Sequence, residues 1–175
     1  ASHILEHMCF KGTPKRTAFE ISAAVDAVGG RLNAYTTKEL TNYHAVVPGE
    51  QIQVALDILS DIFLDPLLEP KQLDLERGVI LEELKMYEDT PDDIVHDLFA
   101  EAIFEGHILG RPIIGTRETI KSISRKDLFD YRSVYYVPNN VIIALAGAVD
   151  TPRVREYLET AFRNLQGKYD RKTHA

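Results

Sequence analysis

The sequence has little cysteine, with Cys9 alone among 175 residues, and it has no tryptophan. A single cysteine cannot form an internal disulfide, so a disulfide-stabilised fold is excluded and a reducing compartment is favoured. No apolar run approaches the roughly 20 residues that a membrane-spanning helix needs, and no signal peptide is visible. We therefore expect a protein without a membrane span, located in the cytoplasm.

The sequence also lacks an excess of basic residues. It carries 20 Lys and Arg against 27 Asp and Glu, for a formal net charge of −7. Nucleic acids and anionic membranes bind basic surfaces, so neither is expected as a partner, whereas basic peptides are compatible with this charge. A hydrophobic fraction of 45% is typical of a packed globular protein. We predict one domain over residues 1–168, with 169–175 as a linker or tail.

Hydrophobic periodicity indicates mainly helices. Thr17, followed three residues later by Glu20, forms a capping box at a helix start, and Gly29-Gly30 ends that helix. We expect helices over 2–10, 17–28, 50–64, 71–88, 91–105, 117–121, 125–136 and 151–165. Tyr, Thr and Val enrichment predicts two strands within 31–48, with a turn near 38–39, and an apolar strand within 137–149. The fold class is then α+β, with a mixed or antiparallel sheet covered on one face by helices.

The first seven residues contain His3, Glu6 and His7 among apolar neighbours. Each helical residue turns by about 100°, so the two histidines lie one turn apart on one face, where both can bind a single zinc ion. Glu6 can reach a zinc-bound water without being a ligand and can accept its proton. The order His-x-x-Glu-His is the inverzincin signature. The alternative is a buried helix with two hydrogen-bonded histidines.

A catalytic zinc needs a third protein ligand and an open position. The helix expected at 71–88 offers Glu76, Glu82, Glu83 and Glu88. Glu76 and Glu83 are seven residues apart and share a face, whereas Glu82 is turned by about 100° from Glu83. Periodicity does not say which of these faces the first helix, and an acidic stripe exposed to solvent is the alternative.

Several blocks together resemble the pitrilysin and mitochondrial-processing-peptidase family of zinc endopeptidases, in particular its small bacterial members. The blocks occur in the family's order: HILEHMCFKGT, GGRLNAYTTKELTNYH, ERGVILEELKMYEDTPDD, HILGRPIIGT and YYVPNNVIIALAG. The resemblance implies a metalloendopeptidase with one zinc ion per site, held by His3, His7 and Glu83. It further implies that Glu6 is the general base and that Glu76 supports the site. A bacterial cytoplasm is then expected, with an organelle matrix as the alternative.

The resemblance also implies residues that bind an extended peptide. Asn33, Ala34 and Tyr35 match the edge strand that pairs with the substrate backbone, with an ordinary sheet strand as the alternative. Phe10 matches a residue of the pocket for the side chain after the cleaved bond; a core phenylalanine is the alternative. Asp93 and Asp97 match an acidic pair that reads arginine near the cleavage site in the mitochondrial enzymes, and a solvated acidic face is the alternative.

The family works as two similar halves that close a chamber around an unfolded protein or peptide. We therefore expect a second similar domain or subunit as partner, and the family's strands before the zinc motif are absent from this sequence. A non-catalytic assembly subunit of the same fold is the alternative function. Glu6 discriminates between the two, because a scaffold has no use for a base beside two histidines.

Overall fold

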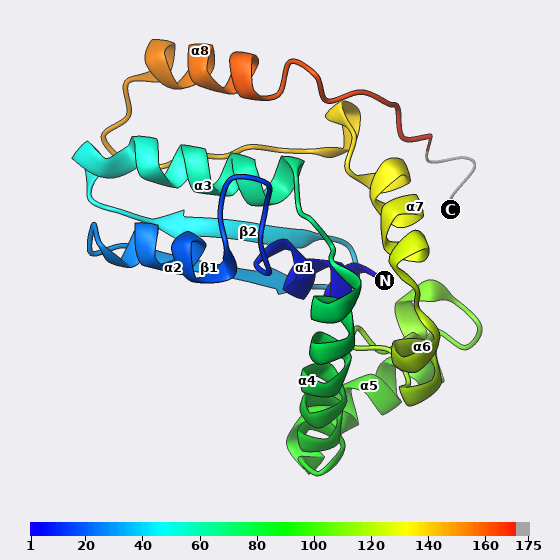
Figure 1. The fold of residues 1–175 in the computed structure, drawn as a ribbon. Helices are drawn as coiled ribbons and strands as arrows, with labels where there is room; N and C mark the ends of the chain where they lie inside the picture. The colour runs from blue at the N-terminus through cyan, green and yellow to red at the C-terminus, as the bar shows by residue number, and fades with distance from the viewer. Residues whose placement is uncertain (171–175) are drawn as a thin grey trace.

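The computed structural model describes residues 1–170, which form helices and one small sheet (Figure 1). The strands are β1 (Arg31–Thr36) and β2 (Thr41–Val46). The helices are α1 (Ser2–Cys9), α2 (Ala18–Asp26), α3 (Ile52–Leu64), α4 (Pro70–Glu88), α5 (Pro91–Ile103), α6 (Arg117–Ser122), α7 (Arg125–Tyr135) and α8 (Thr151–Ala161). Single 3₁₀ turns lie at Gly49–Gln51, Ile108–Gly110 and Pro138–Asn140. The α+β class is confirmed.

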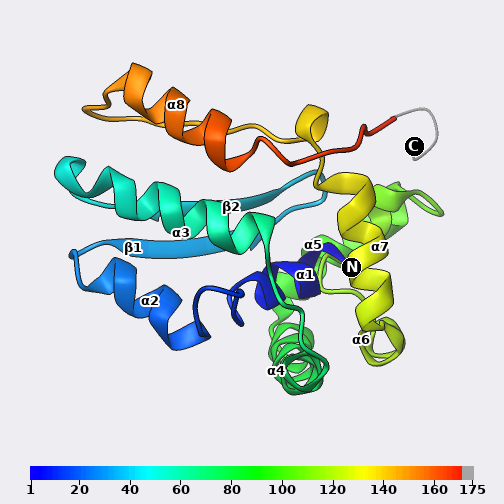
Figure 2. The ribbon, with the colours of Figure 1, turned by 45° about the horizontal axis from the view of Figure 1, so that its top comes forward.

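The two strands form an antiparallel hairpin that helices cover on one face. Its register runs from Arg31 opposite Val46 to Thr36 opposite Thr41, and residues 37–40 make the turn. Exposed and partly buried residues alternate along β1, as expected for a strand with one covered face. Helices α1, α2 and α3 contact the hairpin, and Figure 2 shows α2 and α3 on the same side of it.

Local sequence signals set the ends of α2. The Thr17 side chain accepts from the Glu20 backbone N–H, and the Glu20 side chain accepts from the Thr17 backbone N–H, so the predicted capping box is present. After the helix, Gly29 has a φ of +70°, a conformation that glycine adopts without steric cost. The chain then passes Gly30 and enters β1 directly.

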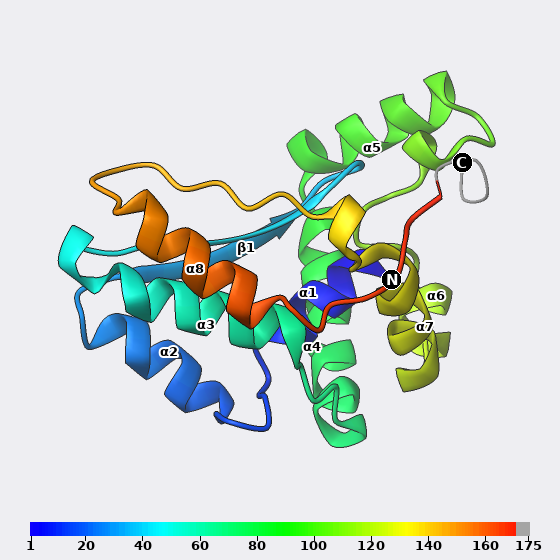
Figure 3. The same ribbon diagram turned by 90° about the horizontal axis from the view of Figure 1, so that it is seen from above.

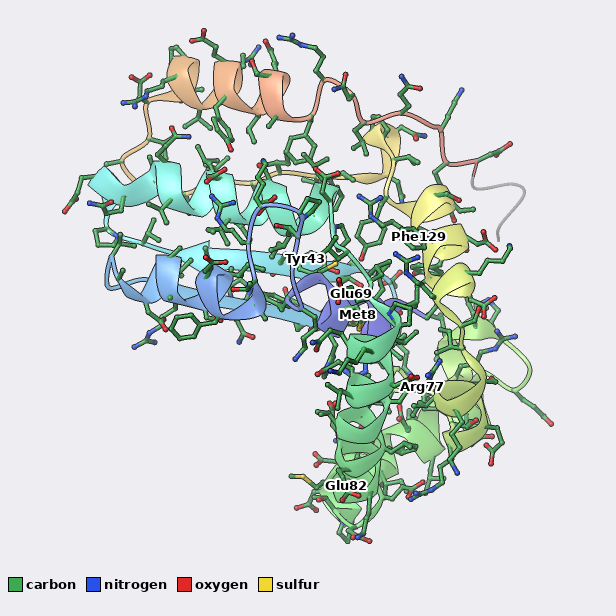
Figure 4. All side chains as sticks on the ribbon, viewed as in Figure 1. Met8, Tyr43, Glu69, Arg77, Glu82 and Phe129 are labelled. Carbon is green, nitrogen blue, oxygen red and sulfur yellow. The ribbon has the colours of Figure 1, made fainter. Side chains whose placement is uncertain are left out.

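The core lies where α1 packs against α4 and the hairpin. Leu5, Met8 and Ile80 are fully buried there, and Figure 4 shows Met8 and Tyr43 in the interior of the molecule. The buried positions of α4 recur at helical spacing: Leu73, Glu76, Ile80 and Leu84. Helices α5 and α6 pack on α4, and Figure 3 shows α5 near the turn end of the hairpin and α6 apart from it. One charged residue, Glu76, thus lies within the apolar stripe of α4.

The strand predicted within 137–149 is wrong for the described structure. Residues 138–140 form a 3₁₀ turn, and residues 141–146 are assigned to neither helix nor strand. Val141 has extended dihedral angles, yet Ile142 is 94% exposed. A strand requires a neighbouring strand for its backbone hydrogen bonds, and in the described residues the sheet consists of β1 and β2. The apolar composition therefore indicated an extended segment correctly but not its pairing.

The boundary predicted at residue 168, between the domain and the tail, stays a prediction. Residues 165–170, after α8, have no helix or strand, and most of the predicted tail, 171–175, lies outside the described residues. Within residues 1–170, no helix combines the length and apolar character that crossing a membrane requires.

Two glycine substitutions test how tightly the chain packs just before β1 and on the surface of α4. A Cβ on Gly30 would lie 2.8 Å from Val25 Cγ1 and 2.9 Å from Val47 Cγ1, so Gly30→Ala should destabilise the protein by about 1–3 kcal/mol. A Cβ on Gly78, within α4, would meet nothing within 4 Å, so Gly78→Ala should stabilise the protein by about 0.5–1 kcal/mol. Denaturant unfolding of both variants measures these changes, and equal effects of the two would contradict the described packing.

Candidate metal centre

Helix α1 places His3 and His7 side by side. Their ring centroids are 4.8 Å apart, as the one-turn spacing predicts. The other faces of the helix are anchored in the core by Ile4, Leu5, Met8 and Cys9. This anchoring fixes the rotation of α1 about its axis, so both imidazoles face α4.

Helix α4 brings Glu83 to both imidazoles. His3 Nε2 lies 3.5 Å from Glu83 Oε1, and His7 Nε2 lies 3.6 Å from Glu83 Oε2. These distances exceed the range of about 2.7–3.2 Å for hydrogen bonds. Two ligands bound tetrahedrally at about 2.1 Å from one zinc ion would lie about 3.4 Å apart, so the observed separations suit a shared ion.

The donor set fits zinc chemically as well as geometrically. One donor atom each from His3, His7 and Glu83 lie within 4.8 Å of one another, and no other group of this kind occurs within residues 1–170. Burial lowers the pKa of His3 to about 4, helped by the neighbouring His7, so the imidazole is neutral at pH 7 and can act as a ligand. The Glu83 side chain is 42% exposed, which leaves solvent access beside the three donors, as a catalytic site requires.

Glu6 lies beside the histidines and is held by the hairpin. Its carboxylate is buried and accepts a hydrogen bond from the hydroxyl of Thr36, the last residue of β1. Burial raises the pKa of Glu6, while the Thr36 hydrogen bond and His7 oppose that shift. A carboxylate with a raised pKa is a better proton acceptor near neutral pH.

Glu76 supports His7 from behind. Its side chain is buried, and Glu76 Oε2 lies 3.1 Å from His7 Nδ1. A neutral His7 that donates from Nδ1 keeps its Nε2 lone pair free toward Glu83. The second carboxylate oxygen, Glu76 Oε1, lies 2.7 Å from Lys11 Nζ. The structure thus brings His3, Glu6, His7, Glu76 and Glu83 together.

The two other glutamates considered on this helix lie elsewhere. Glu82 is exposed and projects from the lower part of α4 in Figure 4. Glu88 is paired with Arg117 on α6. Only the face that carries Glu76 and Glu83 meets α1, which is the choice that periodicity left open.

A hollow of about 280 Å³ adjoins the centre. It is lined by Glu6, His7, Phe10, Lys11, Leu32, Asn33 and Ala34. Phe10, at the end of α1, is partly buried with its ring 6.1 Å from that of Tyr43, so it combines a core contact with a place in the hollow. A larger hollow of about 520 Å³ lies along Arg31 and Val46. That one includes none of the five site residues, so the smaller hollow is the candidate for substrate.

The outer edge of β1 is available for pairing in the described structure. The turn closes with a hydrogen bond from the Thr37 N–H to the Leu40 carbonyl, 2.7 Å. Because antiparallel pairs alternate, Ala34 then directs its N–H and C=O away from β2. Its N–H accordingly meets the side-chain oxygen of Asn33, at 2.9 Å. Tyr35 is half exposed, with its ring 6.1 Å from that of His44.

The two aspartates of α5 have different surroundings. Asp93 is exposed in the first turn, whereas Asp97 Oδ1 lies 3.2 Å from Lys38 Nζ in the hairpin turn. Lys38 also donates to the Arg111 carbonyl at 2.5 Å. An internal cation therefore already pairs with one member of the predicted acidic pair.

Sequence reasoning missed three side chains that contact the candidate residues: Lys11, Thr36 and Lys38. Lys11 follows His7 by four residues, and that helical spacing could have placed it on the same face. Thr36 is 30 residues from Glu6, and Lys38 is 59 from Asp97. No local pattern signals these two contacts, because each depends on how the hairpin packs.

Substitution of adjacent glutamates on α4 tests the centre. Glu83→Gln should weaken zinc binding by more than about 10²-fold, since a neutral amide replaces a ligand and losing even a supporting residue costs 10–100-fold. Glu82→Gln removes the same charge one residue away and should leave the affinity unchanged. Chelator competition on the full-length protein measures both, and equal affinities would remove Glu83 from the centre.

Comparison with known proteins identifies the family of the chain. Residues 1–117 match the family model described as Insulinase (Peptidase family M16). The chain is 44% identical over 167 residues to the uncharacterized zinc protease YmxG of Bacillus subtilis, covering 95% of this chain and 41% of that protein. It is 39% identical over 164 residues to a probable mitochondrial-processing peptidase subunit beta of Arabidopsis thaliana, covering 94% and 31%.

The fold agrees with a solved structure of a protease from Helicobacter pylori. The TM-score is 0.89 at 26% sequence identity, covering 97% of this chain and 41% of that one. The chain thus spans less than half the length of the relatives it matches. The family match extends from the two histidines of α1 beyond Glu83 and the whole of α5, and on this basis the chain belongs to the insulinase family of peptidases, peptidase family M16.

Proposed function

We propose that this chain carries the catalytic zinc site of a metalloendopeptidase that cleaves extended peptides. The observation that carries the proposal is the convergence of His3 and His7 from α1 with Glu83 from α4, beside a buried Glu6. Relatives named zinc proteases support the same metal. One zinc ion would be held by the two imidazoles and the Glu83 carboxylate.

The residues of this chain would each have a separate role in peptide hydrolysis. Zinc, when bound, supplies a Lewis acid that polarises the scissile carbonyl and acidifies water. Glu6 accepts the proton of the attacking water and passes it to the leaving amine. Thr36 orients the Glu6 carboxylate through its hydroxyl. Glu76 holds His7 so that its Nε2 faces Glu83, where the ion would bind.

The substrate would bind as an added strand. The N–H and C=O of Ala34 face outward from β1, and an extended peptide can pair with such an edge through main-chain hydrogen bonds. Asn33 and Tyr35 flank this position, and Phe10 would line the pocket for the side chain after the cleaved bond. We propose that Asp93 and Asp97 together bind a cation only weakly, because Lys38 already pairs with Asp97.

A second, similar half would complete the enzyme. The chain covers 41% of YmxG and 31% of the plant relative, so more than half of each lies outside the match. We propose that this further domain or subunit closes over the β1 edge and stabilises the substrate carbonyl. The cytoplasmic location stays a prediction.

Substitution of Glu6 distinguishes a catalytic function from that of a non-catalytic scaffold subunit. A scaffold subunit would not require a buried carboxylate beside two imidazoles, because burying an ionisable group without a purpose is unfavourable. Glu6→Gln in the full-length protein should keep zinc and lose peptide cleavage by about 10²–10⁴-fold. Cleavage of a fluorogenic unstructured peptide and zinc content are measured together, with Glu82→Gln as control. Full activity of Glu6→Gln would exclude it as the base.

A comparison of residues 1–175 with the full-length protein tests whether a second half is needed for activity. A protein of residues 1–175 alone should cleave the same peptide at least about 10²–10³-fold more slowly than the full-length protein, the usual effect of losing one oxyanion donor. Zinc affinity of both proteins serves as the control, since the three proposed ligands lie within this chain. Equal turnover would contradict the proposed second half and leave the zinc site standing.

A further inference from the structure

Lys11 shares the buried carboxylate of Glu76 with His7. Lys11 Nζ lies 2.7 Å from Glu76 Oε1, and His7 Nδ1 lies 3.1 Å from Glu76 Oε2. The carboxylate is thereby held at both oxygens, each by a group from the same short stretch of chain. Glu76 is 5% exposed, so water contributes little to solvating its carboxylate.

The local backbone explains how Lys11 reaches this position. Helix α1 ends at Cys9, but the Lys11 N–H still donates to the Met8 carbonyl at 3.1 Å, which continues the turn. Four residues after His7, the Lys11 side chain therefore leaves the same side of the chain as the imidazole. Both then meet α4 at Glu76.

The ion pair constrains the direction of the carboxylate. A buried carboxylate needs both hydrogen-bond partners and a compensating charge. His7 Nδ1 lies at hydrogen-bond distance from Oε2. The Lys11 ammonium supplies the charge and occupies Oε1, which leaves Oε2 directed at His7 Nδ1.

We propose that Lys11 is a positioning residue for the metal centre: it holds Glu76 in the orientation that keeps His7 Nε2 directed at the ion. This inference rests on the zinc site of the proposed function. Without the ammonium, the Glu76 carboxylate can turn away, and the His7 ring loses its orientation. A ligand with an unconstrained ring binds its metal more weakly.

The test compares two lysines of one loop in the full-length protein. Lys11→Met removes the ammonium and keeps much of the side-chain length, whereas Lys11→Arg keeps the charge. Lys15→Met is the matched control, because Lys15 is 63% exposed and faces Asp61 rather than Glu76. Zinc affinity is measured by chelator competition, and thermal unfolding of the metal-free proteins is followed in parallel.

The expected result is a loss of zinc affinity by about 10–100-fold in Lys11→Met, the range for residues that orient a metal ligand. Lys11→Arg should recover most of it, and Lys15→Met should bind as the unmutated protein does. Adding Lys11→Met to Glu76→Gln should cause little further loss, because the ammonium acts through that carboxylate. Should Lys11→Met fail to fold, Lys11→Gln, which can donate to Oε1 without a charge, replaces it.

Unchanged zinc affinity in Lys11→Met, with only a lower unfolding temperature of the metal-free protein, would overturn the inference and leave Lys11 a structural residue. His7→Ala is measured alongside, because it removes a proposed ligand itself. If His7→Ala binds zinc as tightly as the unmutated protein, the proposed metal centre is wrong. If His7→Ala loses zinc and Lys11→Met does not, only the role of Lys11 is wrong.

Discussion

The burial of the Glu76 carboxylate between α1 and α4 is the interaction on which the rest of the centre depends. A charge in the apolar stripe of a helix destabilises the fold unless it is paired and hydrogen-bonded. Here both requirements are met from α1 and the residues just after it, by His7 and Lys11. Because these groups must face α4, α1 has one acceptable rotation. That rotation also directs the Nε2 atoms of His3 and His7 at Glu83, which lies seven residues after Glu76 on the same face of α4.

The hairpin supplies the second constraint. Thr36, where β1 ends, hydrogen-bonds to Glu6, so the proposed base is held between a helix and a strand. The same strand presents the outward-facing backbone of Ala34 beside the hollow that Glu6 and His7 line. A peptide paired with this edge would therefore lie close to the proposed base and ligands without any rearrangement of the sheet. Lys38, in the turn, ties the hairpin to α5 through Asp97.

Helical periodicity was a good guide to this chain, and strand composition was a poorer one. The helices occur where the 3.6-residue pattern indicates them, since burying an apolar face requires that spacing. The segment 141–146 has the composition of a strand but finds no partner strand in the described residues. An apolar run records that a segment is suited to burial or pairing. It carries no information about whether a neighbour is present, because strand pairing is a contact between distant residues.

By itself, the sequence determined the secondary structure around the centre, the common face of His3 and His7, and the common face of Glu76 and Glu83. These features follow from rotation per residue within one helix. Only the tertiary structure decided that the two faces meet, that Glu82 and Glu88 lie elsewhere, and that Thr36 and Lys11 hold the two carboxylates. The physical reason is that local backbone geometry relates residues within a helix. The relation between α1, α4 and the hairpin arises from burial of their apolar faces in one core, which no short stretch of sequence encodes.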